Sequence, residues 1–186
     1  TEKLSSIVDW QDRSTCVLFG DGAGACVVGK SEQRIIVSTF MGADGSGGSF
    51  LNVPAGGSRV PISEATIKDR QHFLKMAGNE VFKIAVKIMA EAANKAITKV
   101  GLKCSDIDLL IPHQANIRIL TAVAKRMGLP EEKIFMNIEK YGNMSAASTA
   151  VALVEANREQ RIKKGDNVVL VAFGAGLTYG SVVIKW

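Results

Sequence analysis

The sequence predicts a layered α/β fold in which helices cover a buried mixed sheet. Short apolar runs typical of strands alternate with longer segments whose apolar residues recur every three or four positions. The chain closes with two β-rich runs, at residues 167–173 and 178–186, separated only by the bend at 174–177. Two adjacent strands that follow a strand, helix, strand, helix order indicate a sheet with both parallel and antiparallel neighbours.

Composition is typical of a globular protein and excludes several classes of partner. The 186 residues are 47% hydrophobic and 22% charged, and a chain of this length buries roughly 70% of its unfolded surface. The net charge of +5 is not gathered in one long basic run, which argues against nucleic-acid binding. No apolar run reaches the length of a membrane span, so we expect neither nucleic acid nor a membrane as partner.

The cysteines favour a reducing compartment. Cys16, Cys26 and Cys104 form no CxxC pair and no metal-ligand spacing with the two histidines, and an odd number argues against a disulfide framework. We therefore expect no metal site. Cys16 and Cys26 lie in apolar runs and are predicted to be buried and unreactive. The missing initiator Met leads us to expect a chain that starts after processing, cleavage or trimming.

A glycine cluster, Gly20-Asp21-Gly22-Ala23-Gly24, lies between β-rich runs at residues 16–19 and 25–28. A glycine loop that holds a dinucleotide must open a helix, whereas the segment after this cluster is short and β-branched. We therefore predict a hairpin. The glycines would serve positive φ angles and close backbone approach.

The middle of the chain is predicted to hold a strand, a loop and a helix. Residues 35–40 read as a strand, and the glycine- and serine-rich segment 42–58 as an irregular surface loop. Between residues 71 and 100 apolar residues, many of them alanines, occupy one helix face and allow close packing on a sheet. Gly78 interrupts this pattern at a cost of about 1 kcal/mol relative to Ala, so we expect a tight helix crossing there.

A histidine stands where the next strand ends. The apolar run 108–111 leads to His113, and a strand end both fixes a titratable ring and leaves it accessible. A lone histidine at such a place is more often simply hydrogen-bonded. Asn116 is a predicted N-cap for a helix that Gly128 ends.

The outward positions of that helix include a basic stripe. Lys125 and Arg126 follow Arg118 by seven and eight residues, which places all three on one side of the helix. A solvated helix face is the simpler interpretation of such a stripe. Taken alone, the spacing leaves both interpretations open.

A second polar side chain resembles His113 in its setting. Residues 134–137 are predicted to form a short strand that leads to Tyr141-Gly142-Asn143, and residues 145–164 a helix with small residues early and charges late. Asn143 therefore also lies in a glycine-bounded loop just before a helix.

Five stretches, in this order, resemble β-ketoacyl-acyl-carrier-protein synthase III of the thiolase superfamily. They are Phe19-Gly20-Asp21-Gly22-Ala23-Gly24-Ala25, Met76-Ala77-Gly78-Asn79-Glu80-Val81-Phe82-Lys83, Pro112-His113-Gln114-Ala115-Asn116, Tyr141-Gly142-Asn143-Met144-Ser145-Ala146-Ala147-Ser148 and Ala172-Phe173-Gly174-Ala175-Gly176. The resemblance covers nearly all of this chain, but only the C-terminal half or more of a family member. It implies a thiolase-like layered α/β fold, with residues 1–34 as the end of the N-terminal half and 35–186 as the C-terminal half.

The resemblance implies an acyltransferase that starts fatty-acid synthesis by a decarboxylative Claisen condensation. In the family a cysteine is acylated by acetyl-CoA or another short acyl-CoA, malonyl-carrier protein decarboxylates, and its enolate attacks the thioester. His113 and Asn143 match the catalytic histidine and asparagine, and two neutral donors on one carbonyl oxygen, each worth about 3 kcal/mol, suit an enolate. Ala175 matches a backbone position of the oxyanion hole, where many relatives have Gly. Coenzyme A thioester is then a substrate, and no cofactor is expected.

The same resemblance implies two binding surfaces. Residues similar to those that contact coenzyme A and the phosphopantetheine arm are Arg13, Asn79, Phe82, Ala115 and Asn116. Residues similar to a basic patch that docks the acidic acyl carrier protein are Lys83, Arg118, Lys125 and Arg126. With the resemblance, docking becomes the favoured interpretation of the basic stripe.

The family's nucleophilic cysteine lies upstream of Thr1, and none of the three cysteines sits at its motif. We therefore expect the chain to work with the N-terminal half of the same enzyme, and the complete enzyme to be a cytoplasmic or plastid homodimer. The alternatives are a related hydroxymethylglutaryl-CoA synthase or polyketide synthase, a non-catalytic dimerisation half, and a CoA-binding module without turnover.

Overall fold

A four-stranded mixed sheet organises the computed structural model, which describes residues 1–32 and 35–186. Its strands, in the order β3-β8-β7-β6, are β3 (Ile36–Ala43), β8 (Thr178–Lys185), β7 (Asn167–Gly174) and β6 (Leu109–Pro112). β6 and β7 are parallel, whereas β8 is antiparallel to both β7 and β3. The predicted mixed sheet is therefore confirmed. Residue 34, at the predicted domain boundary between residues 34 and 35, lies outside the described residues.

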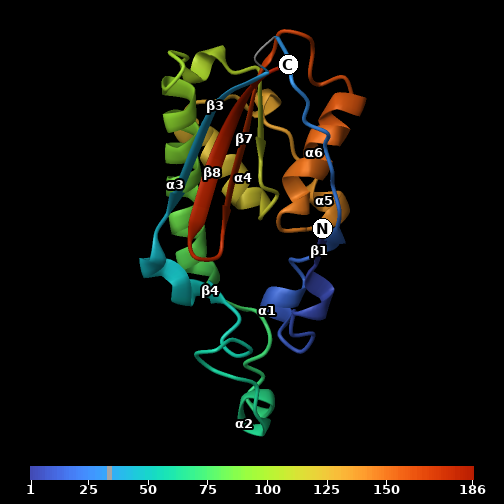
Figure 1. Ribbon diagram of the computed structural model, residues 1–186, viewed down its shortest axis with the longest axis vertical. Helices are drawn as coiled ribbons and strands as arrows, with labels where there is room; N and C mark the ends of the chain where they lie inside the picture. The colour runs from blue at the N-terminus through green and yellow to red at the C-terminus, as the bar shows by residue number, and fades with distance from the viewer. Residues whose placement is uncertain (33–34) are drawn as a thin grey trace.

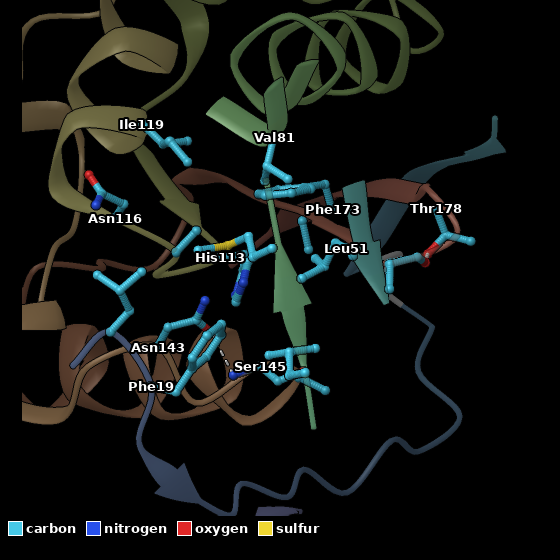
Figure 2. Close-up of a pocket in the computed structure, with 18 of the residues that line it drawn as sticks. Phe19, Leu51, Val81, His113, Asn116, Ile119, Asn143, Ser145, Phe173 and Thr178 are labelled. Atoms are coloured by element: carbon cyan, nitrogen blue, oxygen red, sulfur yellow. Dashed lines mark hydrogen bonds between the residues drawn. The ribbon is translucent and has the colours of Figure 1, made fainter. Parts of the chain in front are cut away.

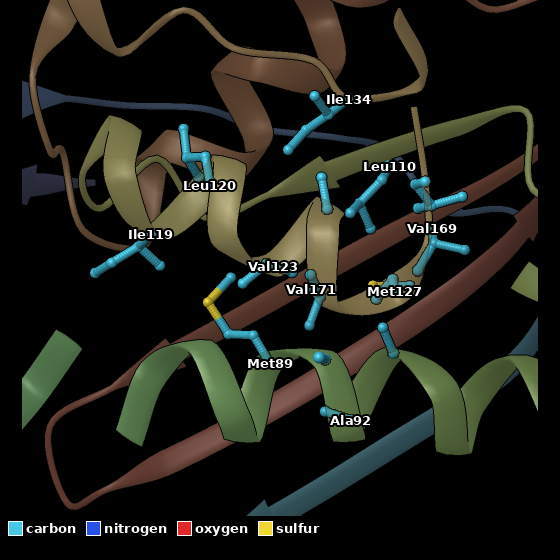
Figure 3. Close-up of a cluster of buried hydrophobic side chains, with 14 of the residues drawn as sticks. Met89, Ala92, Leu110, Ile119, Leu120, Val123, Met127, Ile134, Val169 and Val171 are labelled. Carbon is cyan, nitrogen blue, oxygen red and sulfur yellow. The ribbon is translucent and has the colours of Figure 1, made fainter. Parts of the chain in front are cut away.

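Helices cover both faces of this sheet (Figure 1). α3 (Gly78–Thr98) and α4 (Ile117–Met127) lie on one face, where Met89 and Leu120 share a core with Val169 of β7 (Figure 3). α6 (Ala147–Arg158) lies on the other face, where its buried alanines meet Leu109 and Ile111 of β6. β6 is thus buried on both sides, which explains its uninterrupted apolar sequence.

α4 follows its sequence signals closely. The side chain of Asn116 accepts a hydrogen bond from the backbone N–H of Arg118 at 2.9 Å, and Gly128 adopts a left-handed conformation with φ of 69°. The predicted N-cap and C-terminal glycine are both confirmed. The start of α4 is therefore fixed by Asn116, which lies three residues after His113.

α3 begins seven residues later than its apolar pattern predicted. Residues 75–76 form β5 (Lys75–Met76), which pairs with β4 (Leu51–Asn52), so the chain is extended just before the helix. Gly78 is therefore the first helical residue and not an interruption. The predicted tight crossing at Gly78 is wrong, because an added Cβ would meet only Met76 Cε at 4.0 Å. Close packing by alanine is confirmed, since four of them are fully buried against the sheet: Ala85, Ala92, Ala93 and Ala96.

Two predictions in the second half also need correction. Residues 134–137 form a single bridge, between Ile134 and Leu110, because the backbone groups of Phe135 and Asn137 bond to the side chain of Gln114 instead of a strand. This segment lies between η4 (Glu131–Lys133) and α5 (Ile138–Tyr141). The predicted helix 145–164 is shorter, because α6 ends at Arg158 and Gln160 takes a left-handed φ of 56°.

The predicted N-terminal hairpin is wrong. β2 (Asp21–Gly22) pairs with β1 (Glu2–Lys3) and not with a following strand. The first predicted run, 16–19, begins at the last residue of α1 (Arg13–Cys16), and residues 23–32, which include the second run, form no strand. Val27 and Val28 are 101% and 74% exposed. An isolated two-stranded hairpin is marginal in water, because it has no third strand or helix to pack on. For the same reason Cys16 is only half-buried and Cys26 is exposed, contrary to prediction.

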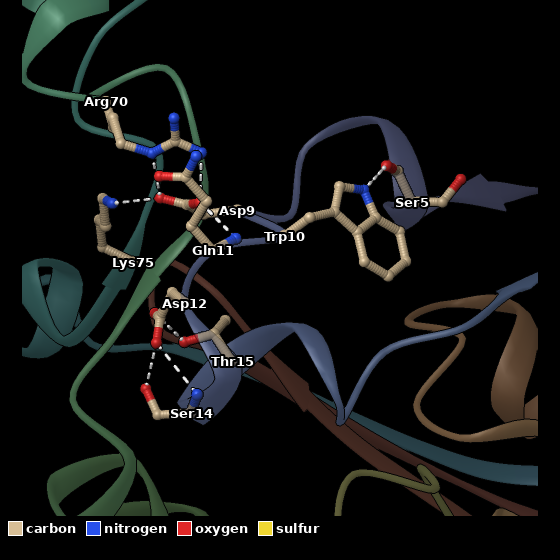
Figure 4. Close-up of polar contacts among 9 residues, drawn as sticks. All are labelled: Ser5, Asp9, Trp10, Gln11, Asp12, Ser14, Thr15, Arg70 and Lys75. Atoms are coloured by element: carbon tan, nitrogen blue, oxygen red, sulfur yellow. Dashed lines mark hydrogen bonds and ion pairs between the residues drawn. The ribbon is translucent and has the colours of Figure 1, made fainter.

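The segment after β3 extends away from the sheet to α2 (Glu64–Lys68), and it contains η2 (Gly45–Phe50) within the predicted surface loop (Figure 1). It is tied to the N-terminal region, which includes η1 (Leu4–Ser6), through buried Asp9 (Figure 4). Arg70 donates two hydrogen bonds to Asp9, the one from Nε at 2.8 Å, and Lys75 Nζ lies 3.5 Å away. These cations hold the pKa of the Asp9 carboxyl well below its usual range.

The remaining short element is η3 (Cys104–Asp106), which precedes β6. Within the described residues, no helix combines the length and the apolar character that a membrane crossing requires.

Candidate active site

One cavity of about 1290 Å³ opens where β3, β6 and β7 end and β8 begins. Its walls are largely apolar, with Leu51, Val81 and Phe173 among them, and a few polar side chains project into it (Figure 2). A concave apolar site with few convergent polar groups, placed at the carboxyl ends of parallel strands, is the usual setting for ligand binding in α/β folds. The cavity is therefore the candidate active site.

His113 enters this cavity directly after β6. Its backbone N–H donates to the carbonyl oxygen of Val171 at 2.7 Å, which fixes the residue to β7, and its ring packs edge-on to Phe173 with centroids 5.9 Å apart. The side chain is 7% exposed, and burial lowers the pKa of His113 to about 4. The imidazole is therefore neutral near pH 7 and carries one N–H donor.

Asn143 enters the same cavity from the loop before α6, and Figure 2 shows its side chain and that of His113 projecting into one region. The Asn143 backbone is held on both sides, since its N–H donates to Leu18 O and its carbonyl accepts from Gly20 N, each at 2.9 Å. Its side-chain oxygen accepts from Ser145 N at 2.8 Å. Because the amide oxygen is occupied in this way, the amide NH₂ is the group that remains to donate into the cavity.

His113 and Asn143 give this cavity two neutral hydrogen-bond donors. Neither group carries a charge at neutral pH, and neither is an acid strong enough to protonate a developing enolate early. Donors of this kind stabilise negative charge that develops on a carbonyl oxygen. The geometry therefore suits carbanion chemistry next to a carbonyl.

The glycine cluster explains how Asn143 reaches this place. A Cβ on Gly20 would lie 2.2 Å from the carbonyl oxygen of Tyr141, and one on Gly22 would lie 2.4 Å from Met144 Sδ. The predicted close backbone approach is thus confirmed, although neither glycine has a positive φ. The residue next to Asn143 that needs a positive φ is Gly142, at 69°.

The other predicted site residues lie in three places. Those that line the cavity are Asn79, Phe82, Ala115, Asn116, Arg118 and Ala175. Arg13 is exposed at the start of α1 and does not line the cavity, although the next residue, Ser14, does. Lys83, Lys125 and Arg126 are exposed on α3 and α4. Their predicted binding roles stay predictions.

The basic stripe continues to the cavity wall. Arg118, which is exposed at the start of α4, places its guanidinium 5.4 Å from the centroid of the Phe82 ring, and both residues line the cavity. Lys83 forms an ion pair with Glu80 at 2.9 Å. Of the four predicted docking residues, only Arg118 therefore brings positive charge to the cavity wall.

None of the three cysteines lines the cavity. Cys104 donates to Asn94 Oδ1 at 2.9 Å, and burial raises the pKa of its thiol, which keeps it protonated. Within the described residues, no cluster of His, Cys, Asp and Glu could hold a metal ion. None of the three cysteines is therefore placed to act as a covalent nucleophile in this cavity.

Sequence reasoning missed two residues that shape the site. Phe173 closes the cavity beside His113, and Gln114 is fully buried behind it. A glutamine within an otherwise apolar, buried segment is the signal that could have identified the second, because a buried amide must find hydrogen-bond partners. Phe173 carried no such signal, since it reads as an ordinary strand residue.

Comparison with known proteins bears on the family and on the fold. The family model described as 3-oxoacyl-[acyl-carrier-protein (ACP)] synthase III C terminal matches residues 97–186, and the model described as 3-oxoacyl-[acyl-carrier-protein (ACP)] synthase III matches residues 1–45. The crystal structure of 3-oxoacyl-[acyl-carrier-protein] synthase III from Aquifex aeolicus VF5 is similar with a TM-score of 0.87 and 45% identity, over 99% of this chain and 55% of that one. The predicted layered fold is thereby confirmed.

Two curated relatives are similar over the whole chain. Beta-ketoacyl-[acyl-carrier-protein] synthase III of Caldanaerobacter subterraneus subsp. tengcongensis is 55% identical over 186 residues, which are 100% of this chain and 56% of that protein. The protein of the same name from Clostridioides difficile is 56% identical over 185 residues, again 100% of this chain and 56% of the relative. The chain thus spans about 56% of the length of these relatives.

Proposed function

The chain belongs to the 3-oxoacyl-[acyl-carrier-protein] synthase III family, and from this premise we propose that it supplies the enolate-stabilising part of a condensing enzyme of fatty-acid synthesis. One observation carries the proposal. A neutral imidazole, His113, and an amide whose oxygen is already occupied, Asn143, line one cavity. Their roles in this reaction are the roles that the resemblance implied.

The reaction has two steps at this site. The carbon–carbon bond to the carboxylate of malonyl-carrier protein breaks, CO₂ leaves, and the electron pair moves onto the thioester as an enolate whose oxygen His113 and Asn143 bind. The enolate carbon then attacks the carbonyl of an acylated cysteine, forms the new carbon–carbon bond and expels the thiolate. Ala175 lines the cavity in the turn between β7 and β8, and its backbone N–H would bind the second oxyanion.

The acyl donor in this proposal is acetyl-CoA or another short acyl-CoA. Asn79, Phe82, Ala115 and Asn116 would bind its phosphopantetheine arm along the cavity, and Arg13 its nucleotide. The complete enzyme would be a homodimer in the cytoplasm or plastid stroma. Light scattering that gives the mass of a monomer for the complete enzyme would rule the dimer out.

We expect this chain alone to form no acyl-enzyme. None of its three cysteines lines the cavity, and the nucleophile would come from the N-terminal half of the same enzyme. Radiolabelled acetyl-CoA should leave no stable adduct on the chain, and adding the N-terminal half should give a labelled cysteine on that half and restore condensation. A Cys26→Ser variant controls for nonspecific reaction at the exposed thiol. A stable acyl group on Cys16 or Cys104 would contradict the proposal.

The basic stripe of Arg118, Lys125 and Arg126, with Lys83, is proposed to dock the acidic carrier protein. In the complete enzyme, Arg118→Glu should lower kcat/KM for malonyl-carrier protein by about tenfold at low salt, because rim charges steer association, and less at high salt. The rate of acylation by acetyl-CoA should stay within about twofold.

Lys164→Glu makes the matched charge change. Lys164 is exposed before the start of β7, at the opposite end of that strand from the cavity, so carrier-protein use should be unaffected. Equal losses with carrier protein and with CoA thioesters in Arg118→Glu would show that Arg118 acts on the shared cavity and not on docking.

A further inference from the structure

The side chain of Gln114 is a fully buried amide directly after His113. Its Nε2 donates to the carbonyl oxygens of Pro112 at 2.8 Å and Phe135 at 3.2 Å, and its Oε1 accepts from Asn137 N at 3.0 Å. Both donor hydrogens and the acceptor are therefore used. Gln114 does not line the cavity, although its neighbours His113 and Ala115 do.

These bonds join the His113 loop to the segment that carries Asn143. Asn137 is itself buried and immediately precedes α5, a helix of only four residues. Its Nδ2 donates to Glu155 Oε2 at 2.8 Å, and the hydroxyl of Tyr141, the last residue of α5, donates to Glu155 Oε1. From Tyr141 the chain passes through Gly142 to Asn143.

After Phe135 N, the backbone of residues 135–137 pairs with the side chain of Gln114 and not with a strand. Phe135 N still donates to Leu110 O at 2.9 Å, but the next backbone groups bond to Gln114 and not to β6. The segment therefore leaves the sheet after one bridge, and the amide determines how far it lies from the end of β6. Loss of this amide would orphan two carbonyl oxygens and one N–H in a dry interior, which favours a shift of the backbone.

We propose that Gln114 is a positioning residue that sets the separation of His113 and Asn143, acting through Asn137 and Glu155 without touching substrate. The inference rests on the proposed function of those two side chains. It adds that their alignment depends on one buried amide between two loops. A misplacement of about 1 Å at reacting groups can cost on the order of 100-fold in rate.

The test is Gln114→Leu in the complete enzyme, followed in its two half-reactions. We expect condensation and malonyl decarboxylation to fall on the order of 100-fold, with acylation of the cysteine by acetyl-CoA within about twofold of wild type. Asn167→Ala is the control, because its Nδ2 donates to Asp106 O at 2.8 Å at the opposite end of β7. It loses this bond and the one that Lys185 donates to its Oδ1, both far from the cavity, and should leave both half-reactions unchanged.

Crystal structures of wild type and Gln114→Leu answer the same question without turnover. We expect the distance between the His113 ring and the Asn143 amide to change by about 1 Å or more. An unchanged distance overturns the inference, as does an equal loss of both half-reactions or no loss at all. If wild type acylates but does not condense, the proposed function has failed, and the measured distance alone then decides for or against the positioning role.

Discussion

His113→Ala and Asn143→Ala should each lower the rate of condensation by about 10²–10³-fold while leaving acylation by acetyl-CoA within about twofold. The reason is that both side chains would bind the enolate oxygen, which exists only after the malonyl thioester loses CO₂. Release of labelled CO₂ and transfer of a labelled acetyl group to the enzyme measure the two steps separately. A variant that loses both steps equally would indicate that the residue acts on the nucleophile and not on the enolate.

The pH profile provides a second measurement on the same residue. Burial lowers the pKa of His113 to about 4, so the ring takes up a proton only as the pH falls toward that value. We expect decarboxylation to show no acid limb with a midpoint near 6.5, the ordinary histidine value, and to fall only as the pH approaches 4. A midpoint near 6.5 that disappears in His113→Ala would contradict the neutral-donor role.

Gly20→Ala should be nearly as damaging, although the residue is distant from His113 in sequence. The added Cβ would lie 2.2 Å from the backbone carbonyl oxygen of Tyr141, which is too close for any adjustment of side chains alone. The backbone that holds Asn143 must therefore move, because Gly20 N bonds to Asn143 O. We expect a loss of condensation on the order of 100-fold, with destabilisation of about 1–3 kcal/mol measured by denaturant unfolding.

Gly29→Ala is the matched substitution, because no atom lies within 4 Å of the Cβ that it would add. It should change neither condensation nor the free energy of unfolding by a measurable amount. Condensation within about twofold of wild type in Gly20→Ala, with Asn143 unmoved in a crystal structure, would show that this contact is dispensable.

Elements that are specified by neighbouring residues form in the structure as the sequence predicts. α4 has its predicted N-cap at Asn116 and its predicted end at Gly128, because capping depends only on neighbouring residues. The two strands at the end of the chain also follow the prediction, since a turn of only three residues, 175–177, is needed to pair them. The resemblance named His113 and Asn143, and the structure brings both to one cavity.

Elements that depend on partners distant in the sequence differ from the prediction. The runs at 16–19 and 25–28 have the composition of strands but form none, because they have no sheet to join. α3 starts late because residues 75–76 pair with β4, a contact that periodicity does not register.

By itself, the sequence determined the layered α/β class, the sheet strands, the caps of α4 and the candidate pair His113 and Asn143. Periodicity and capping are properties of neighbouring residues, and the order of motifs is a property of the linear chain, so all three can be recognised without a fold. Only the tertiary structure decided that Gly20 packs on the Tyr141 carbonyl, that burial keeps His113 neutral and that Gln114 joins the two catalytic loops. Each of these depends on atoms far apart in the chain, whose distance and dehydration arise only when the core is packed.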